Sequence, residues 1–359
     1  MSEPTQEEIV SMVSSIFVIR GISQNLDALQ FEIEREGFKQ KFVQFAQKIE
    51  SKNLVARLES FDGRILLLVN RFKPPKSRQS WIPRLLFVAT IIVVMIDGYY
   101  RTSSANSIVW IGDPFEMAIL YTGSLIGILG VHELGHIIAA KWHKIKTSWP
   151  YFIPGIPVIG AVPTFGALII SRSFTINRDI LFDIGISGPI AGLIVAIIVS
   201  TYGAYLSPTI PDSQASELFS QSELVEIYPS IIMSGTLLIA GKAIDGVEVI
   251  MSPILFAAWF GFLITFLNLL PAWQLDGGHI ARAMLGKKWH RIATYGSIGV
   301  LAALGYVIMA LFVLMFSMRS QDPRPLDDIS PLSRNRKKIF IVAMCLAVLC
   351  APLPFSILP

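Results

Sequence analysis

The spacing of apolar residues divides the chain into two parts. Up to about residue 76, apolar and polar positions alternate over short distances, whereas long apolar runs follow from residue 81 onward. A membrane-spanning helix needs about 20 predominantly apolar residues. The runs that meet or approach this length are 81–100, 115–140, 184–205, 253–270, 292–318 and 339 to the end. We therefore expect an α-helical polytopic membrane protein with about six transmembrane helices.

Residues 1–76 have the pattern of a small soluble α+β domain. Helical spacing covers 9–17 and 38–49, and strand-like patterns cover 29–33, 54–59 and 64–70. The last two strands are joined at Asp62-Gly63, a dipeptide that favours a hairpin turn. The expected order is α-β-α-β-β. A basic, proline-containing linker then leads into the membrane domain, which we place at 77–359.

Two apolar stretches cannot be plain membrane helices. The stretch 151–170 is interrupted by proline and glycine at 154, 155, 157, 160, 163 and 166. Non-helical backbone at membrane depth is tolerated only where protein buries it or water lines it. The second stretch, 231–240, is too short to span, and we expect 228–245 to lie at an interface without crossing.

Composition agrees with a membrane location and excludes several other classes. Hydrophobic residues make up 53% of the chain and charged residues only 16%, against about 25% charged in an ordinary soluble domain. A net charge of +4 is too small and too scattered to predict a nucleic-acid partner. Cys345 and Cys350 both lie in the last apolar run, which excludes a disulfide framework and a cysteine-based metal site.

The second apolar run contains the sequence His132-Glu133-Leu134-Gly135-His136. Two imidazoles at i and i+4 lie on one face of a helix and can hold one metal ion, and the glutamate between them can act on a metal-bound water. Ionisable residues inside an apolar span are costly and usually functional. This motif therefore predicts a metal site inside the membrane domain rather than a polar cluster that only joins helices.

A catalytic zinc site needs a third protein ligand. Asp276 is a candidate because it follows an uncharged run and precedes Gly277-Gly278, which permits a tight turn. His279 could compete with Asp276, whereas His143 and His290 lie among basic and tryptophan residues at the ends of spans.

These motifs together resemble the site-2 protease family of intramembrane zinc metalloproteases. The resemblance is carried by the histidine motif and by Asn268-Leu-Leu-Pro271-Ala-Trp-Gln-Leu-Asp276-Gly277. The segments 163–167, 185–192 and 253–261 resemble the archaeal, cyanobacterial and plastid branch. The similarity covers about 100–331, and residues 1–80 show no sign of a PDZ or CBS domain.

The resemblance implies a zinc metalloendopeptidase whose catalytic core covers about 115–290. One zinc ion would be held by His132, His136 and Asp276, with Glu133 as general base. The substrates would be transmembrane or membrane-adjacent segments of other proteins in the lipid bilayer.

The resemblance also implies a re-entrant β-hairpin at 151–170, whose free edge would receive the substrate as an added strand. Gly166 would lie on the substrate-presenting surface. Asn268 would bind the substrate backbone or the oxyanion, although an asparagine inside a span can also simply bond a neighbouring helix.

Two other classes remain possible on the sequence. A membrane metalloprotease of the prenyl-protein-processing type would take a later glutamate as third ligand, but Glu217, Glu223 and Glu226 lie in a polar loop. A metal transporter or inactive scaffold would keep the fold without the reaction. A transporter should show further acidic or histidine residues within its spans, and a scaffold usually loses part of the histidine motif.

Topology follows from the requirement that His132 and Asp276 lie at the same depth, so the chain must cross an even number of times between them. Lysine and arginine gather before the first run, after the second and after Asp276. The positive-inside rule then places these groups, the N-terminal domain and the mouth of the site in the cytoplasm of a cell membrane. Six spans would put the basic stretch 319–338 outside, against that rule.

Overall fold

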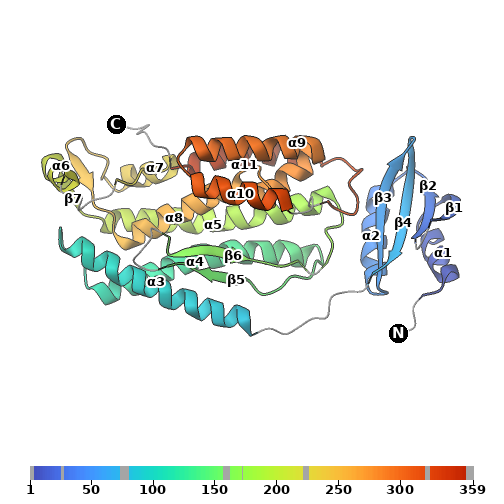
Figure 1. Ribbon diagram of the computed structural model, residues 1–359, viewed down its shortest axis with the longest axis horizontal. Helices are drawn as coiled ribbons and strands as arrows, with labels where there is room; N and C mark the ends of the chain where they lie inside the picture. The colour runs from blue at the N-terminus through green and yellow to red at the C-terminus, as the bar shows by residue number, and fades with distance from the viewer. Residues whose placement is uncertain are drawn as a thin grey trace.

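The computed structural model describes most of the chain, and Figure 1 shows a small N-terminal domain beside a larger helical domain. The described residues are 4–25, 28–72, 81–156, 162–171, 173–220, 226–319 and 324–352.

The N-terminal domain is an antiparallel sheet of four strands in the order β1-β2-β4-β3. Its elements are α1 (Gln6–Ser14), β1 (Ile19–Asn25), β2 (Ala28–Ile33), α2 (Phe38–Glu50), β3 (Leu54–Phe61) and β4 (Arg64–Arg71). The predicted helices, the 29–33 strand and the Asp62-Gly63 hairpin are all present. The strand β1 was not predicted, because it is a mostly polar edge strand with an irregular register between Ile19 and Gly21.

The second domain is mainly helical. Its elements are α3 (Ile82–Asn106), α4 (Pro114–Trp142), β5 (Tyr151–Pro154), β6 (Thr164–Leu168), α5 (Arg178–Leu206), β7 (Thr209–Pro211), α6 (Asp212–Ser220), α7 (Ile231–Ile239), β8 (Val247–Val249), α8 (Pro253–Leu269), α9 (Asp276–Ala303), α10 (Val307–Arg319) and α11 (Arg334–Cys350). Among the described residues, α3, α4 and α5 are long and apolar enough to cross a bilayer, and α8 and α10 are shorter apolar helices.

The stretch 151–170 contains an antiparallel hairpin, in which Tyr151 pairs with Leu168 and Pro154 with Thr164. The hairpin packs beside α3 and α4 (Figure 1). Pro157 and Gly160, which also interrupt the predicted irregular stretch, lie outside the described residues. The helix α7 has only nine residues, too few to span, in agreement with the prediction for 228–245.

The single span predicted at 292–318 is wrong. The structure has two helices there, α9 and α10, which end and begin around Gly305 at a φ of +86°. Glycine adopts this left-handed backbone without a Cβ penalty. The chain therefore changes direction at Gly305 and ends α9 there, although the apolar residues on both sides suggested one continuous helix. A second change of direction inside α9 occurs at Gly286, with φ +76°.

The Gly286 bend of α9 and the segment that follows α10 both lie on the side of the N-terminal domain. Arg282, near the Gly286 bend, binds Asp328 with an Nη2–Oδ2 distance of 2.7 Å. Leu58 of β3 donates its backbone N–H to Leu326. Burial raises the pKa of the Asp328 carboxyl, but hydrogen bonding and charge from Arg282, together with Arg178, outweigh it and hold that pKa below its ordinary value.

The helix α11 therefore begins on that same side, where Arg336 binds Asp183 at 2.6 Å. Its other end, with the bridge between Ser230 and Pro352, lies at the opposite end of the helical domain near α6 and α7 (Figure 1). After the Gly286 bend the chain thus runs along α9 and returns along α10, which packs against it. Six spans would place the basic stretch 319–338 outside, but Arg324 contacts Glu59 of the N-terminal domain and Arg336 contacts Asp183 near the start of α5.

This arrangement predicts the sidedness of three exposed positions. In a background lacking Cys345 and Cys350, cysteines introduced at Lys288 and Lys338 should share one side of the membrane, and a cysteine at Ser216 should lie on the other. Labelling with an impermeant thiol reagent, in intact and in opened cells, measures this directly. Labelling at 338 that follows 216 rather than 288 would restore six single spans.

Candidate metal centre

The two motifs found in the sequence meet at one point in the structure. His132 and His136 project from α4, and Asp276 is the first residue of α9. The His132 Nε2 atom lies 3.2 Å from His136 Nε2, and the Asp276 Oδ2 atom lies 3.2 Å from each of these nitrogens. The three ligand atoms therefore form an equilateral triangle.

The geometry of this triangle fits a tetrahedral metal ion. Ligands at about 2.0–2.1 Å from zinc in a tetrahedron stand about 3.3 Å apart, close to the observed spacing. The His136 Nδ1 atom lies 2.7 Å from the carbonyl oxygen of Ile184, which can only accept a hydrogen bond. Nδ1 must therefore donate, which leaves Nε2 of a neutral His136 with its lone pair directed into the triangle.

Glycines on α5 bring that helix against both histidines. A Cβ added at Gly188 would overlap the His136 imidazole, and one at Gly192 would lie 3.0 Å from the Cβ of His132. Gly185 is equally close to α9, since an added Cβ would lie 3.1 Å from the Asp276 carbonyl oxygen. The spacing of these glycines, three and four residues, places them on one face of α5.

The turn between α8 and α9 fixes Asp276. A side chain at Gly277 would overlap the backbone of Leu269, and one at Gly278 would overlap the carbonyl of Trp273. The paired glycines are therefore required by close backbone approach. Trp273 itself has a φ of +48°, and its carbonyl oxygen lies 3.0 Å from His290 Nε2.

Glu133 and Asn268 complete the polar surroundings of the site. Glu133 is buried on α4 beside His132, with 7% of its surface exposed. The Asn268 Nδ2 atom, near the end of α8, lies 3.4 Å from His132 Nε2. Both residues thus lie next to His132, one of the three possible ligands.

The other histidines have different positions. His143 caps α4 and binds Asp183 through Nε2 at 2.9 Å. The Nδ1 atom of His279 is buried without a hydrogen-bond partner in the described structure, and His279 is not part of the ligand triangle. Within the described ranges, His132, His136 and Asp276 form the one group of histidine, cysteine and carboxylate side chains close enough to hold a metal.

Some residues of the site could not be assigned a role from the sequence. The three α5 glycines and the Ile184 carbonyl support the histidines directly. The only available signal was the glycine spacing at 185, 188 and 192, which indicates a close helix contact without naming the partner. Gly166 lies in β6 with a φ of +87°, and a Cβ added there would meet no atom within 4 Å. The geometry of the metal centre does not test its predicted role in binding the substrate.

Comparisons with known proteins agree with this site. The profile of peptidase family M50 matches residues 121–312. The chain is 30% identical over 259 residues to the probable zinc metalloprotease EGY1, chloroplastic, of Arabidopsis thaliana, which covers 66% of this chain and 45% of the relative. It is 31% identical over 246 residues to the probable zinc metalloprotease EGY2, chloroplastic, of Oryza sativa subsp. indica, covering 66% and 43%.

A third relative, the probable zinc metallopeptidase EGY3, chloroplastic, of Arabidopsis thaliana, is 25% identical over 275 residues, covering 72% of this chain and 45% of the relative. The chain thus spans less than half the length of these curated relatives. No solved structure matches the chain.

The glycine contacts generate a prediction about metal binding. Gly188→Ala should displace the His136 imidazole and lower zinc affinity by at least tenfold, because losing one ligand's position weakens the site. Gly130→Ala on α4 is the matched control, since a Cβ there meets no atom within 4 Å. Zinc content of the purified proteins, measured after dialysis against a chelator series, gives the comparison. Equal retention by both variants would contradict the assigned contact.

Proposed function

Since the chain belongs to peptidase family M50, we propose that it is an intramembrane zinc metalloprotease. It would hydrolyse peptide bonds within or next to the membrane-spanning segments of other membrane proteins. The observation that carries this proposal is the triangle of His132, His136 and Asp276, with Glu133 buried next to His132. The helix α4, which supplies both histidines and Glu133, is long and apolar enough to cross a bilayer.

The residues of the site divide the reaction between them. Zinc, when bound, would lower the pKa of a coordinated water and polarise the scissile carbonyl. The Glu133 carboxylate takes a proton from the attacking water and later delivers it to the leaving nitrogen. His132, His136 and Asp276 hold the metal, and the hydrogen bond from His136 Nδ1 to Ile184 keeps one imidazole in the required tautomer.

Asn268 is suited to bind the substrate. Its amide nitrogen lies close to His132 Nε2, so it faces the ligand side of the site rather than the lipid. An amide N–H at this position can donate to the scissile carbonyl oxygen as negative charge develops on it. The side chain would thus favour the transition state without touching the general base.

The β5–β6 hairpin is the element proposed to present the substrate. A transmembrane helix satisfies its own backbone hydrogen bonds, so it must unwind before a protease can engage it. An unwound segment can pair with the edge of a β-strand. Phe165 and Leu168 of β6 are both exposed, and the backbone at Gly166 has no side chain to obstruct an incoming strand.

The proposed location is a cell membrane, with the N-terminal domain and the mouth of the site in the cytoplasm. The basic residues 141–146, 282–291 and 334–338 all lie toward the side of the N-terminal domain. That asymmetry supports a cytoplasmic face under the positive-inside rule. The loop region around α6, at the opposite end, carries the acidic residues Asp212 and Glu217.

The two rival functions find no support in the described structure. Glu217 and Glu226, two of the glutamates that a prenyl-processing type of site would need, are absent from the ligand group, and Asp276 provides the third ligand position. Glu223 lies outside the described residues. A non-catalytic scaffold has no need for a glutamate buried beside His132.

The central test is Glu133→Gln, which removes the base but keeps the shape of the side chain. The variant should keep its zinc and lose cleavage of a model transmembrane substrate by about 10²–10⁴-fold, the usual contribution of general acid–base catalysis. Asp276→Ala should lose both zinc and cleavage. Full activity of the Glu133→Gln protein in reconstituted vesicles would exclude the proposed mechanism.

A further inference from the structure

The helix α2 of the N-terminal domain contacts the base of the β5–β6 hairpin. The Gln47 side chain donates to the carbonyl oxygen of His143, at the end of α4 that leads into the hairpin. Glu50 accepts a 2.7 Å hydrogen bond from the hydroxyl of Ser173, just beyond β6. The ring of Phe72, after β4, packs edge-on against Phe174 with centroids 4.9 Å apart.

Ser173 joins the two arms of the hairpin to this domain. Its hydroxyl accepts from the backbone N–H of Lys146 on the incoming arm while it donates to Glu50. The arms are also paired there by the bridge between Thr147 and Ser171. A change in the position of Glu50 would therefore act on both arms of the hairpin, before β5 and after β6.

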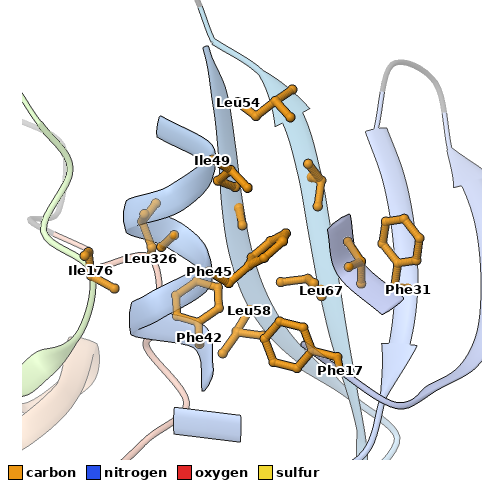
Figure 2. Packing of buried hydrophobic residues seen from close by; sticks show 14 of the residues in the cluster. Phe17, Phe31, Phe42, Phe45, Ile49, Leu54, Leu58, Leu67, Ile176 and Leu326 are labelled. Carbon is orange, nitrogen blue, oxygen red and sulfur yellow. The ribbon is translucent and has the colours of Figure 1, made fainter. Parts of the chain in front are cut away.

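The two domains share one hydrophobic core at this junction. Phe42, Phe45 and Ile49 of α2 belong to the same buried cluster as Ile176 and Leu326 of the helical domain. Figure 2 shows Ile176 beside α2, on the side away from the sheet. The N-terminal domain is therefore packed against the helical domain and is not merely tethered to it.

Backbone pairing strengthens the same contact. The segment 326–327 lies between β3 and the residues that precede α5. Leu58 donates to Leu326, while Leu326 and Asp327 donate to the carbonyl oxygens of Thr175 and Ile176. Lys39 of α2 adds an ion pair to Asp179 in the first turn of α5, at 2.8 Å.

The hairpin has reason to need such support. Its strands have four and five residues, and an isolated two-stranded hairpin of this size is only marginally stable. We propose that the N-terminal domain anchors the hairpin, through Glu50 and Phe72, in the position in which it receives a substrate strand. This inference rests on the proposed function of the hairpin. It implies that contact between the N-terminal domain and the hairpin sets the affinity for substrate.

The test removes both contacts from the N-terminal side in the full-length protein. The variant is Glu50→Ala with Phe72→Ala, and both residues are only partly buried and lie away from the metal centre. Glu7→Ala with Phe61→Ala is the matched control, because both of those residues are exposed on the same domain. Glu50→Gln with Phe72→Tyr keeps an acceptor and a ring, and it serves as the rescue.

Backbone hydrogen exchange followed by mass spectrometry reports on the hairpin without any need for activity. Residues 147–156 and 164–171 should exchange up to about tenfold faster in the alanine variant, since one hydrogen bond and one aromatic pair are lost. The peptide that contains residues 132–136, the control and the rescue should exchange like the unmodified protein. Unchanged exchange in the hairpin of the alanine variant overturns the anchoring role.

Steady-state cleavage of a transmembrane substrate then tests the consequence. The alanine variant should show a severalfold higher KM with kcat and zinc content unchanged. A fall in kcat or zinc at constant KM would overturn the inference, because it would indicate a general structural role. If the unmodified protein cleaves no substrate, the proposed function fails, while the exchange measurement still decides whether the domain anchors the hairpin.

Discussion

The structure depends on holding two imidazoles and one carboxylate at a single point among apolar helices. Buried polar groups of this kind are costly unless they are fully paired, and their mutual spacing of 3.2 Å matches the ligands of one metal ion. The close approach of α5 to α4 holds the two imidazoles in place. The α5 glycines Gly188 and Gly192 remove the side chains that would otherwise separate α5 from the histidines of α4.

This requirement explains the less regular parts of the chain. Asp276 reaches the histidines because α9 begins there; Gly277 and Gly278 lie in the first turn of α9 instead of forming the predicted tight turn, and they let the backbone after α8 pack closely against it. The α9–α10 excursion then returns the chain to the side from which α11 starts. The N-terminal domain occupies that same side, where it contacts the start of α5 and the base of the hairpin. The N-terminal domain, the base of the hairpin and the start of α11 thus lie at the same end of the helical domain.

The sequence led to the same three side chains that the structure brings together, because H-E-x-x-H on a helix predicts two ligands and the resemblance to the site-2 protease family singled out Asp276 over His279. It was also sufficient for most of the N-terminal domain. It was insufficient for α9 and α10, since an apolar run of 27 positions at 292–318 gives no sign of direction and Gly305 is one of several glycines there. The contacts of Glu50 with Ser173 join residues 123 positions apart, which no local pattern reveals.

The most direct test of the metal centre is zinc X-ray absorption spectroscopy on the purified, zinc-loaded protein. The ligand triangle predicts two imidazole nitrogens and a carboxylate oxygen at about 2.0–2.1 Å, with no sulfur scatterer. His136→Ala should lose the bound zinc, because two protein ligands remain. A spectrum with three imidazoles would instead assign His279 as a ligand in place of Asp276. That result, or a sulfur shell, would contradict the site described above.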